Sequence, residues 1–255
     1  MTAPEFISEF DLGYNNILGE GAPGLDNYER SVYLTTAQEE LAKALYTGTL
    51  PLDKGRSPRL GTPGFEGVER QRRALNELVK DHKTVDVVTS SRGLVDDSKF
   101  FSIPSDVMFV IAETATISST DSCLNGKVVV VKPITHDEFM TSYRNPFRKP
   151  NSNKVWRVDI SKENSSNTVE LVSAENLSAY NVRYVKYPNP IIVSDLTTDT
   201  QVGGLGLTIN GATALATSEL NSYLHREIVN RAVELAVRDY RENTLKTRIE
   251  TNNRV

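Results

Sequence analysis

The spacing of apolar residues changes twice along this chain, and the change limits the folds open to it. Between about residues 26 and 46 apolar side chains recur every three to four positions, as on one face of a helix, and the pattern returns at about 219–240. From Thr84 onward the chain instead holds short β-rich runs, separated by turn signals such as Asn125-Gly126. Helical segments at both ends and strands between them predict an α+β fold.

Further elements follow from local signals. A loop at 48–64 holds three prolines and four glycines, and an apolar stripe predicts a second helix at about 64–81. The stretch "THDEFMTSYRN" predicts a short helix capped by Thr135. The β-rich runs include "KVWRVDIS" and "NVRYVKYPNPIIV". The glycines of "GGLGLTING" indicate a flexible connection before the last helix.

A single domain is the simplest organisation for the 255 residues, since a chain of this size can bury roughly 70–75% of its unfolded surface. We expect a helical part at 1–83 and a β-rich part at 84–195. Residues 196–255 would hold the glycine-rich connection, the C-terminal helix and a polar tail. The predicted architecture has N-terminal helices and a long C-terminal helix packed with a central, mostly antiparallel β-rich region.

Composition excludes several classes of protein. The net charge of −4 and the pI near 5.5 argue against a general nucleic-acid coat, which would carry a basic excess. The single cysteine, Cys123, excludes an internal disulfide and a thiolate metal cluster. No apolar run approaches the ~18–20 residues of a membrane span. The first ten residues carry acids where a signal peptide would carry bases, so we expect a soluble protein that is not exported by that route.

No constellation of catalytic, cofactor or metal-binding residues stands out. His82, His136 and His225 are far apart in sequence, and none has the spacing of a zinc motif. The segment "GGLGLTING" fails as a dinucleotide fingerprint because Ile209 occupies a required glycine position. There is no G-x-S-x-G motif. We therefore expect no enzyme, no cofactor and no metal.

The most unusual segment is "YRNPFRKPNSNKVWR" at residues 143–157, with five positive charges and no negative one. Cations and aromatic rings together are typical of single-strand nucleic-acid binders. Arginines and aromatics on a proline-containing loop are also enriched in protein interfaces, which we favour. Trp156 belongs to the strand pattern "VWRVDI", so we expect it to re-enter the core. A nucleic-acid-binding module using 143–157 stays the alternative.

Four stretches together resemble virion structural proteins of tailed bacteriophages. They are "YNNILGEGAPGLDNYERSVYLTTAQEELAKALYTG", "YRNPFRKPNSNKVWRVDI", "VRYVKYPNPIIV" and "LNSYLHREIVNRAVELA". The nearest resemblance is to the ring or head-to-tail adaptor proteins found beneath the portal in crAss-like phages. The stretches occur in the order of that family and span most of the chain.

The resemblance implies a non-enzymatic ring, expected to be a dodecamer, in the neck between the portal and the tail. Its partners would be further copies of itself, the portal protein and adjacent neck or tail proteins. Genome DNA would pass through the channel without specific binding, and no membrane would be involved. The protein would be made in the host bacterial cytoplasm and would function in the virion.

A ring subunit needs two different lateral faces that complement each other. We expect a basic arm and the C-terminal tail to supply contacts, with the tail from Arg238 becoming ordered on a neighbour. The predicted partner-contact residues are Arg144, Phe147, Arg148, Lys149, Arg238, Arg241 and Arg248.

Overall fold

The computed structural model describes most of the chain. The described residues are 1–19, 23–47, 73–85, 87–88, 93–95, 98–159, 167–200, 202 and 205–252, with side chains given as far as Glu242. The predicted loop at 48–64 and residues 64–72 of the predicted helix at 64–81 lie outside these residues.

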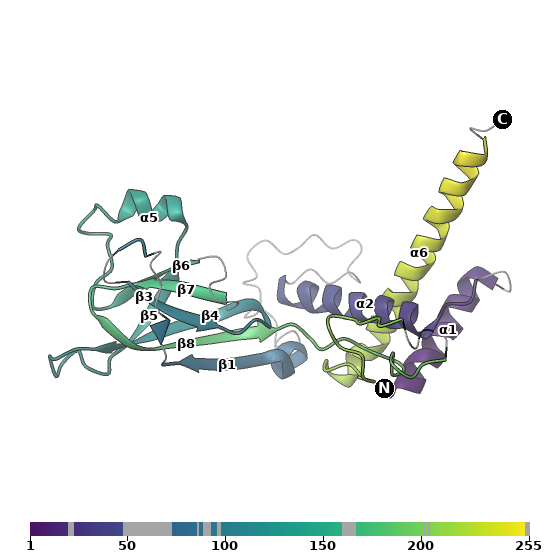
Figure 1. Ribbon diagram of the computed structural model, residues 1–255, viewed down its shortest axis with the longest axis horizontal. Helices are drawn as coiled ribbons and strands as arrows, with labels where there is room; N and C mark the ends of the chain where they lie inside the picture. Colours follow the sequence, from purple (N-terminus) through teal and green to yellow (C-terminus); the bar gives the residue numbers. More distant parts are fainter. Residues whose placement is uncertain are drawn as a thin grey trace. The chain divides into compact units, whose positions relative to one another are not determined.

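The chain divides into two compact units. The helical unit combines Met1–Leu78 with Pro188–Val255, and the strand unit is Val79–Tyr187. Figure 1 shows the helices α1, α2 and α6 in the first and the sheet with α5 in the second. The predicted α+β class is therefore confirmed. Whether the chain unfolds as a single domain stays a prediction.

Helix α1 (Ala3–Leu18) was not predicted from the sequence. Thr2 and Glu5 form a capping box, and Glu5 Oε2 accepts a hydrogen bond from the Thr2 amide at 2.8 Å. The helix buries a stripe of side chains against α6 (His225–Asn252), which belongs to the same unit. The buried residues of α1 are Ala3, Phe6, Phe10 and Tyr14.

Helix α2 (Asn27–Thr47) confirms the helix predicted at about 26–46. The chain that follows the last strand runs beside α2, and buried polar side chains of α2 hold it there. Thr35 Oγ1 accepts from the Ile191 amide at 3.1 Å, and Ser31 Oγ accepts from the Val193 amide at 3.1 Å. The run around Ile191 was predicted to be β-rich. Its backbone is instead paired largely with helix side chains, as buried polar groups require.

The glycine-rich connection contains a tight turn rather than only a flexible link. Asn210 and Gly211 have φ values of 50° and 81°. Ile209 and Ala212 flank them as a bridged pair, with both hydrogen bonds at 2.9 Å. Two consecutive positive φ angles are typical of a type I′ turn, for which Asn-Gly is the favoured sequence. This position therefore has a defined turn conformation, and the flexibility of the connection stays a prediction.

The last helix begins with a short 3-10 turn at Ser222–Leu224 and continues as α6 to Asn252. The predicted end near residue 240 was therefore too early. Val237 is the last buried side chain among those described. No helix in the described part of the chain is both long enough and apolar enough to cross a membrane.

The strand unit is one mixed sheet in the order β1-β8-β4-β5-β6-β7-β3-β2. Only β5 and β6 pair in parallel among the described strands, so the mostly antiparallel prediction is confirmed. The strands are β1 (Val79–Thr84), β2 (Val87–Val88), β3 (Lys99–Ile103), β4 (Val107–Ser118), β5 (Val128–Pro133), β6 (Lys154–Asp159), β7 (Asn167–Val172) and β8 (Asn176–Lys186).

Strand β1 corrects the end of the predicted helix at 64–81. A short helical turn ends at Leu78, and Val79 begins the strand. The strand pairs with β8 along its whole length, from Val79 opposite Val185 to Thr84 opposite Tyr180. Its sequence is largely polar, so tertiary pairing decides its conformation.

The sheet curls until distant strands in its order meet. Thr84 Oγ1 on β1 donates to the Ser102 carbonyl on β3 at 3.2 Å. The rings of Phe101 on β3 and Tyr180 on β8 lie 5.8 Å apart in a tilted arrangement. Twisted sheets of this size commonly close up in this way. The curl encloses the main apolar core of the strand unit.

Candidate assembly surfaces

Helix α5 (His136–Ser142) anchors the segment that carries the predicted basic arm. The Thr135 side chain accepts a hydrogen bond from the Glu138 amide at 3.2 Å, which confirms the predicted cap. Phe139 packs edge-on against Trp156, with ring centroids 6.2 Å apart. Tyr143 stacks on Phe139, with ring centroids 5.0 Å apart. The chain therefore leaves α5 from a fixed position on the strand unit.

Asn145 organises the arm, defined here as residues 143–149. Its Oδ1 accepts from the Phe147 amide at 3.0 Å, and its carbonyl accepts from the amides of Arg148 and Lys149 at 3.0 Å. Pro146 fixes one backbone angle inside this turn. The turn therefore gives this stretch of backbone a defined conformation.

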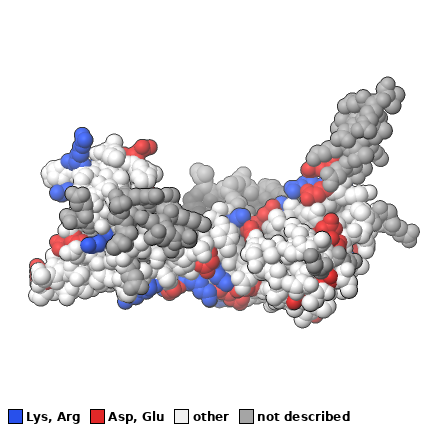
Figure 2. All heavy atoms as spheres, viewed as in Figure 1, with Lys and Arg blue, Asp and Glu red and all other residues white. Residues whose placement is uncertain are grey.

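Phe147 is the most exposed large apolar side chain in the described residues, at 96%. Arg144, Arg148 and Lys149 surround it in sequence and are all exposed. Figure 2 shows basic side chains at the upper left, over the loop that follows α5. An exposed aromatic ring on a rigid turn, flanked by cations, matches the residue types that anchor protein interfaces.

The other end of the 143–157 segment is buried. Trp156 is 2% exposed and belongs to a small core with Phe139, so the predicted return to the core is confirmed. The Arg157 side chain is 12% exposed and forms ion pairs with Glu113 and Asp159. Trp156 and Arg157 are thus little available to the nucleic-acid partner of the alternative hypothesis. The segment divides into an exposed arm and a buried strand.

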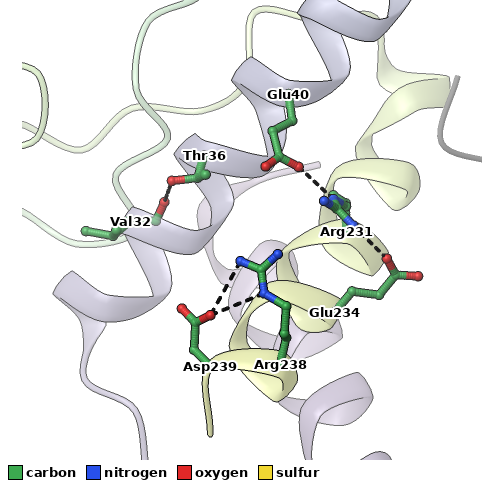
Figure 3. Close-up of polar contacts among 7 residues, drawn as sticks. All are labelled: Val32, Thr36, Glu40, Arg231, Glu234, Arg238 and Asp239. Carbon is green, nitrogen blue, oxygen red and sulfur yellow. Dashed lines mark hydrogen bonds and ion pairs between the residues drawn. The ribbon is translucent and has the colours of Figure 1, made fainter. Parts of the chain in front are cut away.

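The second predicted surface is the C-terminal part of α6. Figure 3 shows polar contacts of α6 beside α2, from Arg231 to Asp239. Arg231 joins the two helices, because its Nε lies 2.7 Å from Glu40 Oε2 on α2. Its Nη1 lies 3.0 Å from Glu234 Oε2 on its own helix. The hydrogen bond to Glu40 is the main reason that the pKa of Arg231 is raised. This contact fixes α6 two turns before its packing ends.

Arg238 is 57% exposed in its side chain and turns toward carboxylates of its own helix. Its Nε lies 3.5 Å from Asp239 Oδ1 and 3.9 Å from Glu242 Oε1 (Figure 3 shows the Asp239 contact). Arg241 is exposed, and the side chain of Arg248 lies outside the described part. The structure therefore groups the four arm residues on one unit and the α6 residues on the other.

Two exposed apolar features had not been identified from the sequence. Leu12 and Ile17 on α1 are 64% and 50% exposed, and Val128 and Val130 on β5 are 62% and 67% exposed. Leu12 could have been identified because it falls outside the buried helical stripe of α1. The four-valine run of β5 must present alternate residues to opposite faces of the sheet.

The sequence of the chain was compared with known proteins and protein families. Residues 1–248 match the family described as phage tail ring protein 3/4. Ring protein 3 of Bacteroides phage crAss001 is 37% identical over 238 residues, covering 93% of this chain and 95% of the relative. Ring protein 4/5 of the same phage is 33% identical over 258 residues, covering 100% and 99%. The predicted resemblance is confirmed, and the chain belongs to the phage tail ring protein 3/4 family.

Proposed function

We propose that this protein forms a dodecameric ring in the neck of a tailed phage, joining the portal to the tail without catalysing a reaction. The family match and the two ring proteins of phage crAss001 support a structural ring component of the virion. The chain would be made in the cytoplasm of the bacterial host. Its direct partners would be its own copies, the portal protein and adjacent neck or tail proteins.

The observation that carries the proposal is the 96% exposure of Phe147 on a hydrogen-bonded turn. The aromatic side chain of Phe147 contributes most to binding when a partner removes it from water. The hydrogen-bonded turn lowers the conformational entropy lost on binding. A closed ring uses two different faces of each subunit. The arm provides one face, with Arg144, Arg148 and Lys149 as its charged rim.

The C-terminal end of α6 provides the contact with the portal or a neighbouring ring. The helix continues to Asn252, and Val237 is the last buried residue among those with described side chains, which end at Glu242. A helical segment with few packing contacts is marginally stable in water. Arg238, Arg241 and Arg248 would meet acidic groups on the partner, and the segment would gain stability there.

Genome DNA would pass through the channel without specific binding. The net charge of −4 suits a passage that does not retain DNA, because phosphates are held by clusters of cations. Burial of Trp156 and pairing of Arg157 leave less of the 143–157 segment for a nucleic-acid partner.

The test is the native mass of the purified protein, alone and mixed with a portal protein. We expect a closed oligomer of about twelve copies, or its formation upon the portal, as closed cyclic symmetry predicts. A monomer that never binds portal would refute the proposal. DNA binding that weakens steeply with salt would favour the nucleic-acid alternative instead.

A further inference from the structure

We propose that the arm of one copy docks on the outward face of α1 of the next copy. The inference rests on the proposed ring and names the surface that receives Phe147. We call this face the α1 stripe, and it consists of Glu5, Glu9, Leu12 and Asn16. The partner is thus a second copy of this chain.

The α1 stripe is a single outward face of the helix. Its members are three or four residues apart, a spacing that aligns side chains along one side of a helix. The buried stripe, from Ala3 to Tyr14, points elsewhere, toward α6. Leu12 is 64% exposed and lies one turn from Glu9 and two turns from Glu5. Leu12 beside two carboxylates complements Phe147 beside cations, because apolar groups and opposite charges would face each other.

The two units also differ in charge in the sense that docking requires. By sequence, the helical unit has 20 acidic and 15 basic residues, a net charge of −5. The strand unit has 13 acidic and 14 basic residues, a net charge of +1, and the two units together give the −4 of the chain. The arm itself carries three bases and no acid. Attraction of opposite charges would orient two copies arm to helix and disfavour arm to arm.

Other carboxylates of the helical unit already have cationic partners. Glu40 and Glu234 share Arg231. Asp11 lies 2.9 Å from Arg30.

The acids of the α1 stripe are engaged more loosely. Glu5 accepts a hydrogen bond from an uncharged amide, that of Thr2. Glu9 lies 3.8 Å from Arg226, whose side chain is 82% exposed and can turn away. An incoming guanidinium therefore finds charge here that the subunit does not already neutralise tightly.

Docking would place the ring of Phe147 over Leu12, with Arg148 near Glu9. Arg148 follows Phe147 directly in sequence, so it can reach Glu9, which lies one turn from Leu12. Mutual burial of the apolar pair would exclude water from the flanking ion pair, which strengthens it.

A charge swap tests the pairing. Arg148→Glu alone and Glu9→Arg alone should each weaken self-association roughly tenfold, because each sets like charges together. The double variant should recover to within about threefold of the unmodified chain, since the attraction is restored with reversed sign. The matched control combines Arg148→Glu with Glu77→Arg, an exposed acid of the same unit that is not on α1. Self-association is measured by sedimentation, with circular dichroism to verify folding.

Each result decides between the two proposals. Recovery with Glu9→Arg and none with Glu77→Arg supports the α1 stripe. Equal recovery in both, or recovery in neither while the unmodified chain still forms rings, overturns the α1 stripe and leaves the ring proposal standing. Failure of the unmodified chain to associate, alone or with portal, overturns both.

Discussion

The guanidinium of Arg157 lies against the carboxylate of Glu113 inside the strand unit, where 12% and 3% of the two side chains are exposed. The residues belong to β6 and β4, the two strands that flank β5. Tyr180 donates its hydroxyl to Glu113 Oε1 at 2.9 Å, and Asp159 Oδ1 lies 3.0 Å from Arg157 Nε. Burial is the largest cause of the raised pKa of Tyr180. The hydroxyl therefore stays protonated and continues to donate.

Replacing Arg157 by leucine should destabilise the protein by about 3–5 kcal/mol, because the buried Glu113 carboxylate would lose its cation. The control is Arg157→Leu combined with Glu113→Gln, which removes the stranded charge and should recover part of the loss. Urea unfolding measures both. A loss for Arg157→Leu no larger than that of an exposed ion pair would show that the pair is not buried in solution.

Trp156→Ala should destabilise by roughly 3–5 kcal/mol, because it leaves a cavity beneath α5 next to Phe139. Loss of the indole also removes the only tryptophan, so unfolding must be followed by circular dichroism. Lys154→Ala, on the same strand, is the matched control and should cost far less. Equal effects from the two variants would contradict the assignment of Trp156 to the core.

Local sequence patterns predicted several of the helices and strands. Apolar spacing placed α2 to within one residue at each end, and Thr135 marked the start of α5. The two quoted β-rich runs located β6 and the second half of β8. For the arm, the prolines and charges were enough to predict an exposed basic loop. The core position of Trp156 followed from its strand pattern.

Long-range pairing determined what the sequence did not reveal. The polar segment of β1 becomes a strand only because β8 supplies its partners. Ile191 was predicted to lie in a β-rich run, yet its amide bonds to Thr35 on a helix distant in sequence. Arg157 follows Trp156 directly on β6, and the sequence did not predict its partner. The sheet curls enough to enclose Arg157 beside Glu113. A local sequence pattern does not predict such contacts between residues that are distant in sequence.

Phe147→Ala should leave the free energy of unfolding unchanged within about 0.5 kcal/mol, since a 96% exposed side chain contributes little to the fold. The same change should weaken ring assembly, as truncation of an interface anchor does. Arg144→Ala and Arg148→Ala should follow the same pattern. Thermal unfolding and native mass separate the two effects. Full assembly by the Phe147 variant would refute the role of the arm.

Deleting residues 241–255 should weaken docking to the portal and leave the fold intact. The reason is that Val237 is the last buried side chain among those described, and Arg231 still joins α6 to Glu40. The expected change in unfolding free energy is within about 0.5 kcal/mol. Pull-down with portal protein measures docking. Unchanged docking would show that the end of α6 has no contact role, and a large loss of stability would show that it packs within the subunit.

His225, at the start of α6, should make the stability of the helical unit depend on pH. It is 6% exposed, its Nε2 lies 2.9 Å from the Leu220 carbonyl, and its ring lies 5.3 Å from that of Phe6. Burial is the main cause that lowers the pKa of His225 below 6.5, and the N-terminal ammonium, 2.7 Å from Nδ1, lowers it further. Together they outweigh the Leu220 carbonyl and the Glu77 carboxylate, which favour the charged form.

The sign follows from proton linkage. The unfolded chain takes up a proton at His225 before the folded chain does, so stability is complete above the unfolded pKa and declines as the pH falls below it. One such group contributes a slope of at most about 1.4 kcal/mol per pH unit. Urea unfolding at pH 7.5 and 5.5 should therefore show a loss of stability at the lower pH. His225→Gln keeps a donor for Leu220 and cannot titrate, so its stability should vary less across this range. If both chains lost the same stability, another group would be responsible for the dependence.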